Sequence, residues 1–126
     1  MEGYCLICGS PYSEEHHVIF RGQQSAMIKC PLNIIHLCHI HHRGNESPHN
    51  NREIDLKYKK DLQEKLESLF SYKECYKEEE VKNILLIHSK DVRKLLKPLC
   101  VAIINKEIGY RREEIIKQCL GGRMYD

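Results

Sequence analysis

Two interleaved sets of metal-binding side chains occupy the first third of this 126-residue chain. The outer set is two pairs, each with two residues between its members: Cys5, Cys8, Cys38 and His41. The inner set starts between these pairs and ends directly after them: His16, His17, Asn33 and His42. Thiolate and imidazole groups bind zinc and similar ions, so this region is the one most able to do chemistry.

The outer set has the residue types and spacing of a structural zinc site, because two closely spaced pairs of such ligands can close a tetrahedron. The 29 residues between Cys8 and Cys38 are a long interval for a plain zinc ribbon. This interval contains a histidine pair, an apolar run and an asparagine. The sequence therefore predicts a zinc that staples the ends of a functional segment.

The same region resembles the HNH endonucleases, also called ββα-metal nucleases, and specifically the subgroup with a zinc knuckle. The resemblance rests on Cys-Leu-Ile-Cys at 5–8, Glu-Glu-His-His-Val-Ile at 14–19 and Asn-Ile-Ile-His-Leu-Cys-His-Ile-His-His at 33–42. Arg-Gly at 43–44 and Pro-His at 48–49 are similar to phage-encoded members. The resemblance covers roughly the first half of the chain. From Ser71 onward we find no resemblance.

The resemblance implies three catalytic residues. His17 would be the general base that takes a proton from the attacking water, a task that suits an imidazole near neutral pH. Asn33 would hold the hairpin loop and help to orient that base, since an amide both donates and accepts hydrogen bonds. Arg43 would contact a phosphate or stabilise the transition state through its planar fork of donors.

The resemblance also implies that His16 and His42 bind a catalytic divalent ion, with His49 as a further ligand or a phosphate contact. Mg²⁺ or Mn²⁺ is expected, and Ni²⁺ or Zn²⁺ also suits imidazole ligands. The zinc knuckle more commonly ends in Cys-x-x-Cys-His, whereas here its last ligand is a histidine. The residues therefore also permit His41 and His42 to exchange metal roles, and the spacing favours His41 for zinc.

The expected fold is α+β: a small ββα-metal (HNH) unit stapled by a structural zinc, followed by a helical C-terminal extension. We expect a nuclease domain with its zinc knuckle and a packing helix over residues 1–70, and the extension over residues 71–126. Alternation ending in β-favouring residues predicts a strand at 14–20, and the apolar residues Ile34, Ile35 and Leu37 predict a second strand at 28–37. A short helix should begin at Cys38, and apolar residues at helical spacing predict a packing helix over 53–70.

Helical spacing also predicts helices over 78–88 and 111–120, the latter ending at Gly121-Gly122. Between them, Ser89 should cap a helix that extends to Ile103, with Pro98 kinking or dividing it. These helices should pack on the nuclease unit, on a second copy in a homodimer, or on a protein partner. A competing interpretation is a helix-turn-helix DNA reader over 102–119, with its turn at Gly109.

Charge and cysteine usage narrow the class of protein. The net charge is +2; residues 1–70 hold 8 Lys and Arg against 9 Asp and Glu, and residues 71–126 hold 12 against 9. Neither half is a polycation, so nucleic-acid binding should be modest and salt-sensitive. Seven cysteines, no signal-like start and no apolar run long enough for a bilayer predict a cytoplasmic protein without membrane association.

These observations together predict a metal-dependent HNH endonuclease that hydrolyses DNA phosphodiester bonds, by nicking or by cutting both strands. The resemblance suggests a phage or mobile-element origin. The alternative is a catalytically inactive, zinc-stapled module that binds nucleic acid or protein. A third interpretation, structure-selective cleavage of RNA or branched DNA, would use the same residues.

Overall fold

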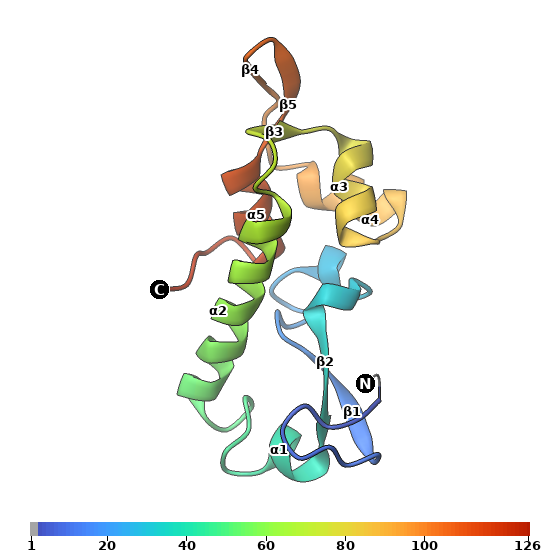
Figure 1. Cartoon of the computed structure of the whole chain (residues 1–126), viewed down its shortest axis with the longest axis vertical. Helices are drawn as coiled ribbons and strands as arrows, with labels where there is room; N and C mark the ends of the chain where they lie inside the picture. The colour runs from blue at the N-terminus through green and yellow to red at the C-terminus, as the bar shows by residue number, and fades with distance from the viewer. Residues whose placement is uncertain (1–2) are drawn as a thin grey trace.

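The computed structural model describes residues 3–126 as a mixed α and β protein with five α-helices and two small sheets. The elements in chain order are β1 (Ser13–His17), η1 (Ser25–Met27), η2 (Pro31–Asn33), β2 (Ile34–Cys38), α1 (His39–Arg43), α2 (Arg52–Leu69), β3 (Cys75–Tyr76), α3 (Glu78–Leu85), α4 (Ser89–Leu96), β4 (Ala102–Ile104), β5 (Glu107–Arg111) and α5 (Arg112–Cys119). The molecule is elongated, with the β1–β2 hairpin and α1 at one end and the β4–β5 hairpin at the other (Figure 1). No helix in the described part of the chain is long and apolar enough to cross a membrane.

The β1–β2 hairpin is antiparallel, and its register places Ser13 opposite Cys38. Both strands are shorter than the predicted ranges 14–20 and 28–37. The strand pairing ends at His17 and Ile34, because the next residue on the second strand's side, Asn33, belongs to the η2 turn. The backbone oxygen of Asn33 accepts the Val18 N–H at 2.8 Å, and its side-chain oxygen accepts the Ile19 N–H at 2.7 Å. The η2 turn begins at Pro31, which has no N–H to offer a strand partner.

Two helices follow the hairpin as predicted. The short helix α1 begins directly after Cys38, which is the last residue of β2 and the N-cap of the helix. The long helix α2 begins one residue earlier than expected, because the Asn51 side chain accepts the N–H groups of Glu53 and Ile54 at 3.0 and 3.3 Å. Its buried positions include Tyr58, Leu62 and Leu66, which confirms the predicted packing helix.

The extension after α2 is not wholly helical, contrary to the prediction. Strands β3, β5 and β4 form a three-stranded sheet in that order. The predicted helix to Ile103 ends at Leu96, because Pro98 has no N–H with which to continue the helical ladder, and Ile103 lies on β4. The competing helix-turn-helix over 102–119 is also wrong, because β4 and β5 form a hairpin there before α5 begins.

Side chains at the helix ends decide where α3 and α4 start. The Glu80 carboxylate accepts the backbone N–H of Lys77 at 2.9 Å, which anchors the first turn of α3. Ser89 was expected to cap the next helix, but it is the first helical residue. The cap is His88, whose Nδ1 accepts the Lys90 N–H at 3.1 Å.

One hydrophobic core extends from the hairpin loop to the C-terminal helix. Phe70 at the end of α2 packs edge-on against Tyr76 of β3, with ring centroids 5.0 Å apart. The Gln63 side chain on α2 exchanges two hydrogen bonds with the backbone of Tyr125, at 2.7 and 2.9 Å. The Cys30 thiol in the hairpin loop donates to the Leu85 carbonyl oxygen at 3.2 Å. The C-terminal elements therefore brace the loop that joins β1 and β2.

Gly109 on β5 lies against the backbone of β3 and leaves no space for a side chain. A Cβ atom there would stand 2.8 Å from the Tyr76 carbonyl oxygen and 3.0 Å from its nitrogen. We predict that Gly109→Ala lowers the unfolding free energy by about 1–3 kcal/mol, the usual cost of overpacking. Thermal or urea unfolding measures the loss, and Gly22→Ala is the control because nothing lies within 4 Å of its Cβ position. Equal stability of the two variants would contradict this account of the sheet.

Candidate metal centres

The outer set of ligands comes together where the start of the chain meets the end of β2. Cys5 and Cys8 lie in a tight loop, in which the Cys5 carbonyl accepts the Gly9 N–H at 2.9 Å. The Leu6 N–H donates to the His36 carbonyl oxygen at 2.8 Å, which fastens this loop to β2. Cys38 ends β2 and His41 follows on the first turns of α1. Backbone contacts thus hold all four ligands in place.

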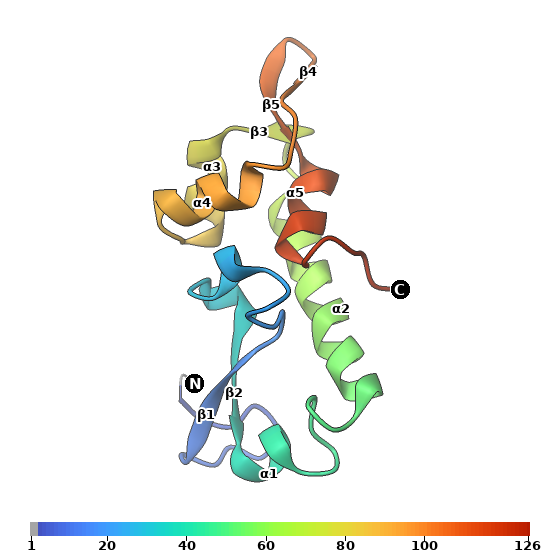
Figure 2. The same cartoon turned by 180° about the vertical axis from the view of Figure 1, so that it is seen from behind.

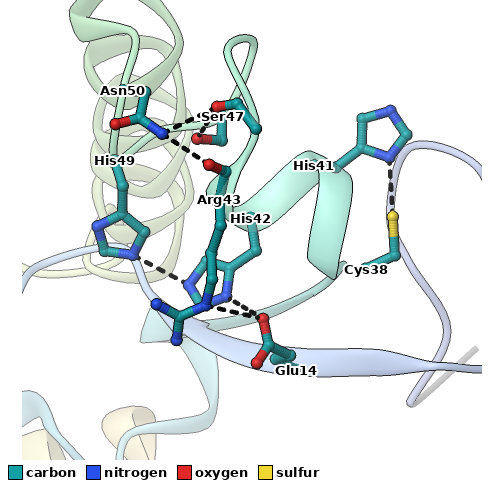
Figure 3. Close-up of polar contacts among 9 residues, drawn as sticks. Glu14, Cys38, His41, His42, Arg43, Ser47, His49 and Asn50 are labelled. Carbon is teal, nitrogen blue, oxygen red and sulfur yellow. Dashed lines mark hydrogen bonds and ion pairs between the residues drawn. The ribbon is translucent and has the colours of Figure 1, made fainter.

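The distances within the outer cluster fit a tetrahedral ion. Zn–S and Zn–N bonds of normal length give ligand-to-ligand separations of roughly 3.3–3.8 Å. The Sγ atoms of Cys8 and Cys38 are 3.7 Å apart. The His41 Nδ1 lies 3.6 Å from the Cys5 Sγ. It lies 3.2 Å from the Cys38 Sγ (Figure 3). The cluster of Cys5, Cys8, Cys38 and His41 can therefore hold a metal ion such as zinc.

Thiolate formation in the outer cluster is favoured at two of the three sulfurs. Burial raises the pKa of Cys5, but the backbone hydrogen bonds at Cys8 and Cys38 outweigh it and bring the value to about 6. A backbone hydrogen bond at His41 lowers the pKa of Cys38. The hydrogen bond to Cys38 in turn raises the pKa of His41, because the sulfur stabilises a protonated ring. A bound cation would take the place of these shared protons.

A second cluster consists of His16 on β1, His42 on α1 and His49 in the loop before α2. The ring centroids are 5.1 Å apart for His16 and His42, 5.0 Å for His16 and His49, and 4.7 Å for His42 and His49. His16 and His42 are buried, whereas His49 is exposed and forms the solvent side of the cluster. The structure therefore brings together the predicted ligands of the inner set.

The loop from Gly44 to Asn50 folds back over α1 and brings His49 to this cluster. The Asn50 side-chain amide donates to the carbonyl oxygens of Arg43 and Gly44 at 2.7 and 3.1 Å. The buried Ser47 hydroxyl donates to the Gly44 carbonyl oxygen at 2.6 Å (Figure 3). His49 was predicted as a further ligand or a phosphate contact, and these bonds place its Nε2 3.0 Å from the Nε2 of His42.

The Glu14 carboxylate sets the tautomer of His42, a contact that the sequence analysis did not anticipate. Its Oε1 lies 2.8 Å from the His42 Nδ1, and this hydrogen bond lowers the pKa of Glu14 (Figure 3). An ionised carboxylate only accepts hydrogen bonds, so Nδ1 carries the proton and Nε2 presents its lone pair. Glu14 and His16 lie two residues apart on β1, so they share one face. This spacing of two residues is the sequence feature that could have indicated that Glu14 lies near the histidine cluster.

Two further features show that the inner cluster suits a cation. The Nε2 of His16 is buried and has no hydrogen-bond partner in the described part of the chain. Burial, followed by the charges of His49, His42 and Lys59, lowers the pKa of His16 to about 3, so its ring stays neutral. Neutral imidazole is the form that ligates metals. A bound ion would satisfy the orphaned nitrogen and also the two facing Nε2 atoms of His42 and His49.

His17 points away from this cluster and is anchored in the hairpin loop. Its Nε2 lies 2.9 Å from the Ile28 carbonyl oxygen. A carbonyl oxygen only accepts, so Nε2 carries the proton and Nδ1 has the free lone pair. Neighbouring strand residues face opposite sides, which is why His16 and His17 have separate surroundings.

Asn33 is buried and cross-links the loop that holds His17. Its side-chain amide donates to the carbonyl oxygens of Ile19 and Met27, both at 3.1 Å, in addition to accepting the Ile19 N–H. The amide thus contacts three backbone groups of this loop, two of which belong to Ile19 beyond the end of β1.

Arg43 stands at the solvent edge of the inner cluster. Its Nε donates to Glu14 Oε1 at 3.3 Å, and its terminal nitrogens lie on the side away from that carboxylate (Figure 3). Its side chain is 57% exposed, so it is open to a ligand that approaches His49.

Lys59 and Phe20 contact each other beside the inner cluster, and the sequence did not predict this contact. The Lys59 ammonium lies 3.8 Å from the Phe20 ring centroid and bonds both oxygens of Asp55, at 2.7 and 2.8 Å. The Phe20 ring stacks on His49, with centroids 5.7 Å apart. A lysine on an amphipathic helix looks like an ordinary surface residue in sequence, yet this one is buried.

The chain matches no protein-family model, no curated protein and no solved structure in the comparisons. Its geometry is thus the direct basis for any function assigned to it.

We predict that Cys8→Ser abolishes tight zinc binding at the outer cluster and lowers the melting temperature by roughly 10 °C or more, since structural zinc contributes folding free energy directly. Metal analysis and calorimetry of the purified protein measure both effects. Cys100→Ser is the matched control, because Cys100 is equally an exposed free thiol but lies outside both clusters. Zinc content equal to wild type in Cys8→Ser would exclude the four-ligand centre.

Glu14→Gln should weaken ion binding at the inner cluster by roughly 10–100-fold, the usual effect of removing the carboxylate behind a metal-binding histidine. The outer cluster should retain its metal. Calorimetric titration of zinc-loaded protein with Mn²⁺ or further Zn²⁺ measures the change. Glu15→Gln is the control, because the exposed Glu15 faces the opposite side of β1. Similar affinities for the two variants would contradict the role given to Glu14.

Proposed function

We propose that this chain is a metal-dependent endonuclease of the HNH type that hydrolyses DNA phosphodiester bonds. The observation that carries the proposal is the inner cluster. There the buried Nε2 of His16 has no hydrogen-bond partner among the described residues, and it lies beside the facing Nε2 atoms of the buried His42 and the exposed His49. Its neighbour His17 has a free Nδ1 outside that cluster. A hydrolytic site needs both parts, an ion-binding pocket with an open side and a separate base.

The backbone of the hairpin supports this assignment. An antiparallel pair of strands leads directly into a short helix, and the cluster residues lie on β1, on α1 and in the loop after it. This order of two strands and a helix supports the proposal, since the sequence motifs predict a ββα unit. The outer cluster closes the same hairpin at the end where Ser13 pairs with Cys38, as the zinc knuckle of that nuclease subgroup would.

His17 would act as the general base through Nδ1. The Ile28 carbonyl holds the proton on Nε2, so Nδ1 remains free to accept a proton from water. The water oxygen then forms a bond to phosphorus as one P–O bond to the neighbouring sugar breaks, and the departing oxygen takes up a proton from solvent. Asn33 keeps this base in position by bonding the carbonyl oxygens of Ile19 and Met27 and so holding the loop closed.

His16, His42 and His49 would hold the catalytic ion, which when bound supplies Lewis-acid stabilisation of charge on the phosphate and leaving oxygen. Glu14 fixes the ring of His42 so that Nε2 faces the cluster. Arg43 would donate to phosphate oxygens from the exposed edge, because its Glu14 contact uses Nε and leaves the terminal nitrogens for a ligand. An exposed His49 leaves the approach to the cluster open to a nucleic-acid backbone.

A zinc-stapled module without catalysis needs the outer cluster alone. Such a module gives no reason for three convergent imidazoles. The buried His16 Nε2 has no hydrogen-bond partner among the described residues, and an unpartnered buried nitrogen of this kind costs about 1–3 kcal/mol of stability in a purely structural role. This cost favours the enzyme over the binding module. The number of ions bound per chain distinguishes the enzyme from the binding module, because the nuclease should bind two ions per chain.

We predict that wild-type protein nicks or linearises supercoiled plasmid with Mg²⁺, Mn²⁺ or Ni²⁺, and that His17→Ala reduces the rate by roughly 10²–10⁴-fold, the usual contribution of a general base. Gel analysis of plasmid forms over time gives the rates. The variant must keep its zinc and its melting temperature, so that lost activity reports the base rather than the fold.

His36→Ala is the matched control, because His36 is a partly buried histidine on the other strand of the same hairpin and lies outside both clusters. Its activity should stay within a few-fold of wild type. A folded, two-ion protein that cleaves neither plasmid nor single-stranded DNA with any of the ions would refute the proposed activity.

A further inference from the structure

The elements after α2 have the connectivity of a helix-turn-helix followed by a β-hairpin. The helices α3 and α4 are consecutive and in contact, and three residues, Leu86 to His88, join them. Leu86 ends α3 in the left-handed conformation, with φ of 56°, which reverses the chain sharply. Strands β4 and β5 follow α4 and complete the sheet with β3, which precedes α3. This is the order of a winged helix-turn-helix, with α4 in the place of the recognition helix.

The packing of the helix pair leaves one side of α4 free. Val81 and Leu85 of α3 are fully buried, and so are Val92 and Leu95 of α4. These residues form the inner faces of the pair, and their opposite sides face solvent. Figures 1 and 2 show α3 and α4 at the side of the molecule away from α2.

The free side of α4 is uniformly basic. Every exposed residue from 89 to 97 is a lysine or an arginine: Lys90, Arg93, Lys94 and Lys97. At 100° per residue these four positions fall within an arc of about 100°, opposite the buried stripe. The exposed side of α2 is different, since acidic and basic residues alternate along it. A merely solvated helix face has that mixed character, so the single sign on α4 points to an anionic ligand.

These charges are not used by internal ion pairs. No carboxylate lies within salt-bridge distance of Lys90, Arg93 or Lys97 in the part of the chain that the structure describes. Lys94 has one contact, with the Ser25 hydroxyl at 3.4 Å. Lys59 and Lys73, by comparison, are both paired with carboxylates. The positive charge of α4 is therefore available to a partner.

The β4–β5 hairpin is shaped to project beside such a partner. Ile104 pairs with Glu107, so the connection has two residues, Asn105 and Lys106, with φ of 52° and 70°. Positive φ at both positions matches the tight turn that two-residue hairpins require. The exposed Lys106 thus stands at the tip of this hairpin. The hairpin itself forms one end of the molecule (Figure 2).

We propose that α4 enters the major groove of duplex DNA and that the β4–β5 hairpin contacts the adjacent backbone. The major groove is about 12 Å wide and admits a helix, and a second helix after a short turn is the usual reader. The purpose of this contact, to bring a duplex to the nuclease site, rests on the proposed function. The binding itself needs no catalysis, so the two can be tested separately.

The exposed residues of α4 favour duplex DNA over other anionic partners. Its free side carries no apolar residue to enter a lipid surface, and no aromatic ring on which unpaired bases would stack. Arg93 offers a planar fork suited to a guanine edge, and the lysines suit phosphates on either side. Glu78 and Glu79 line a groove with Arg93 between the two helices, so their carboxylates limit affinity on that side.

The test is fluorescence anisotropy with a labelled duplex of roughly 30 base pairs, about three helical turns. All proteins carry His17→Ala, are loaded with zinc and receive no Mg²⁺ or Mn²⁺, so the substrate stays intact. The test variant is Lys90→Gln with Lys97→Gln. The matched control is Lys65→Gln with Lys117→Gln, which removes the same charge from exposed positions on α2 and α5.

We expect the test variant to bind the duplex at least ten-fold more weakly at low salt. Its slope of log affinity against log salt should fall by about 2, one for each lost phosphate contact. The affinity of the control should stay within two-fold of that of the parent.

Equal weakening of both variants, or no duplex binding by the folded parent, would overturn the role of α4. Plasmid cleavage by wild type would in that case still support the nuclease, while α4-dependent binding without cleavage would refute the nuclease alone.

Discussion

The closure of the outer cluster is the constraint on which the rest of the site depends. Cys5 and Cys8 belong to a loop before β1, whereas Cys38 and His41 belong to the junction of β2 and α1, and the four ligand atoms converge within a few ångströms. His41 and His42 are consecutive on α1, so their side chains lie about 100° apart around the helix, and fixing the first ring also fixes the direction of the second. The geometry of one cluster therefore sets the geometry of the other.

Strand alternation gives the two histidines of the pair, His16 and His17, different surroundings. Because β1 is extended, His16 turns into the buried cluster while His17 turns to the Ile28 carbonyl. A slip of one residue in the β1–β2 register would exchange their surroundings. Asn33 opposes such a slip, because its hydrogen bonds to Ile19 and Met27 fit one position of the loop.

The C-terminal elements connect to this hairpin through its loop. Cys30 bonds the Leu85 carbonyl at the end of α3, and the Gln24 side chain donates to the Gln118 carbonyl on α5 at 2.9 Å. The loop that positions His17 and Asn33 is thus part of the same core as α3 and α4. This packing gives a physical route by which a ligand on α4 would be held at a defined place relative to the histidines.

The residue types and spacing were sufficient to group the outer ligands and to place α2, because these signals are local or repeat a short spacing. His16 and His42 were proposed as ligands of one ion through the family resemblance. Tertiary structure alone decided the rest. Only folding could show that Glu14 meets His42 and that Lys59 is buried, and the folded loop after α1 is what brings the predicted His49 to the cluster. The strands β4 and β5 escaped prediction because Ile103 and Ile108 fit a helical or a strand pattern equally, and pairing with β3 determines the outcome. The sequence by itself thus determined which side chains can do chemistry, whereas long-range packing decided which of them meet, since contacts between distant segments leave no periodic trace in the chain.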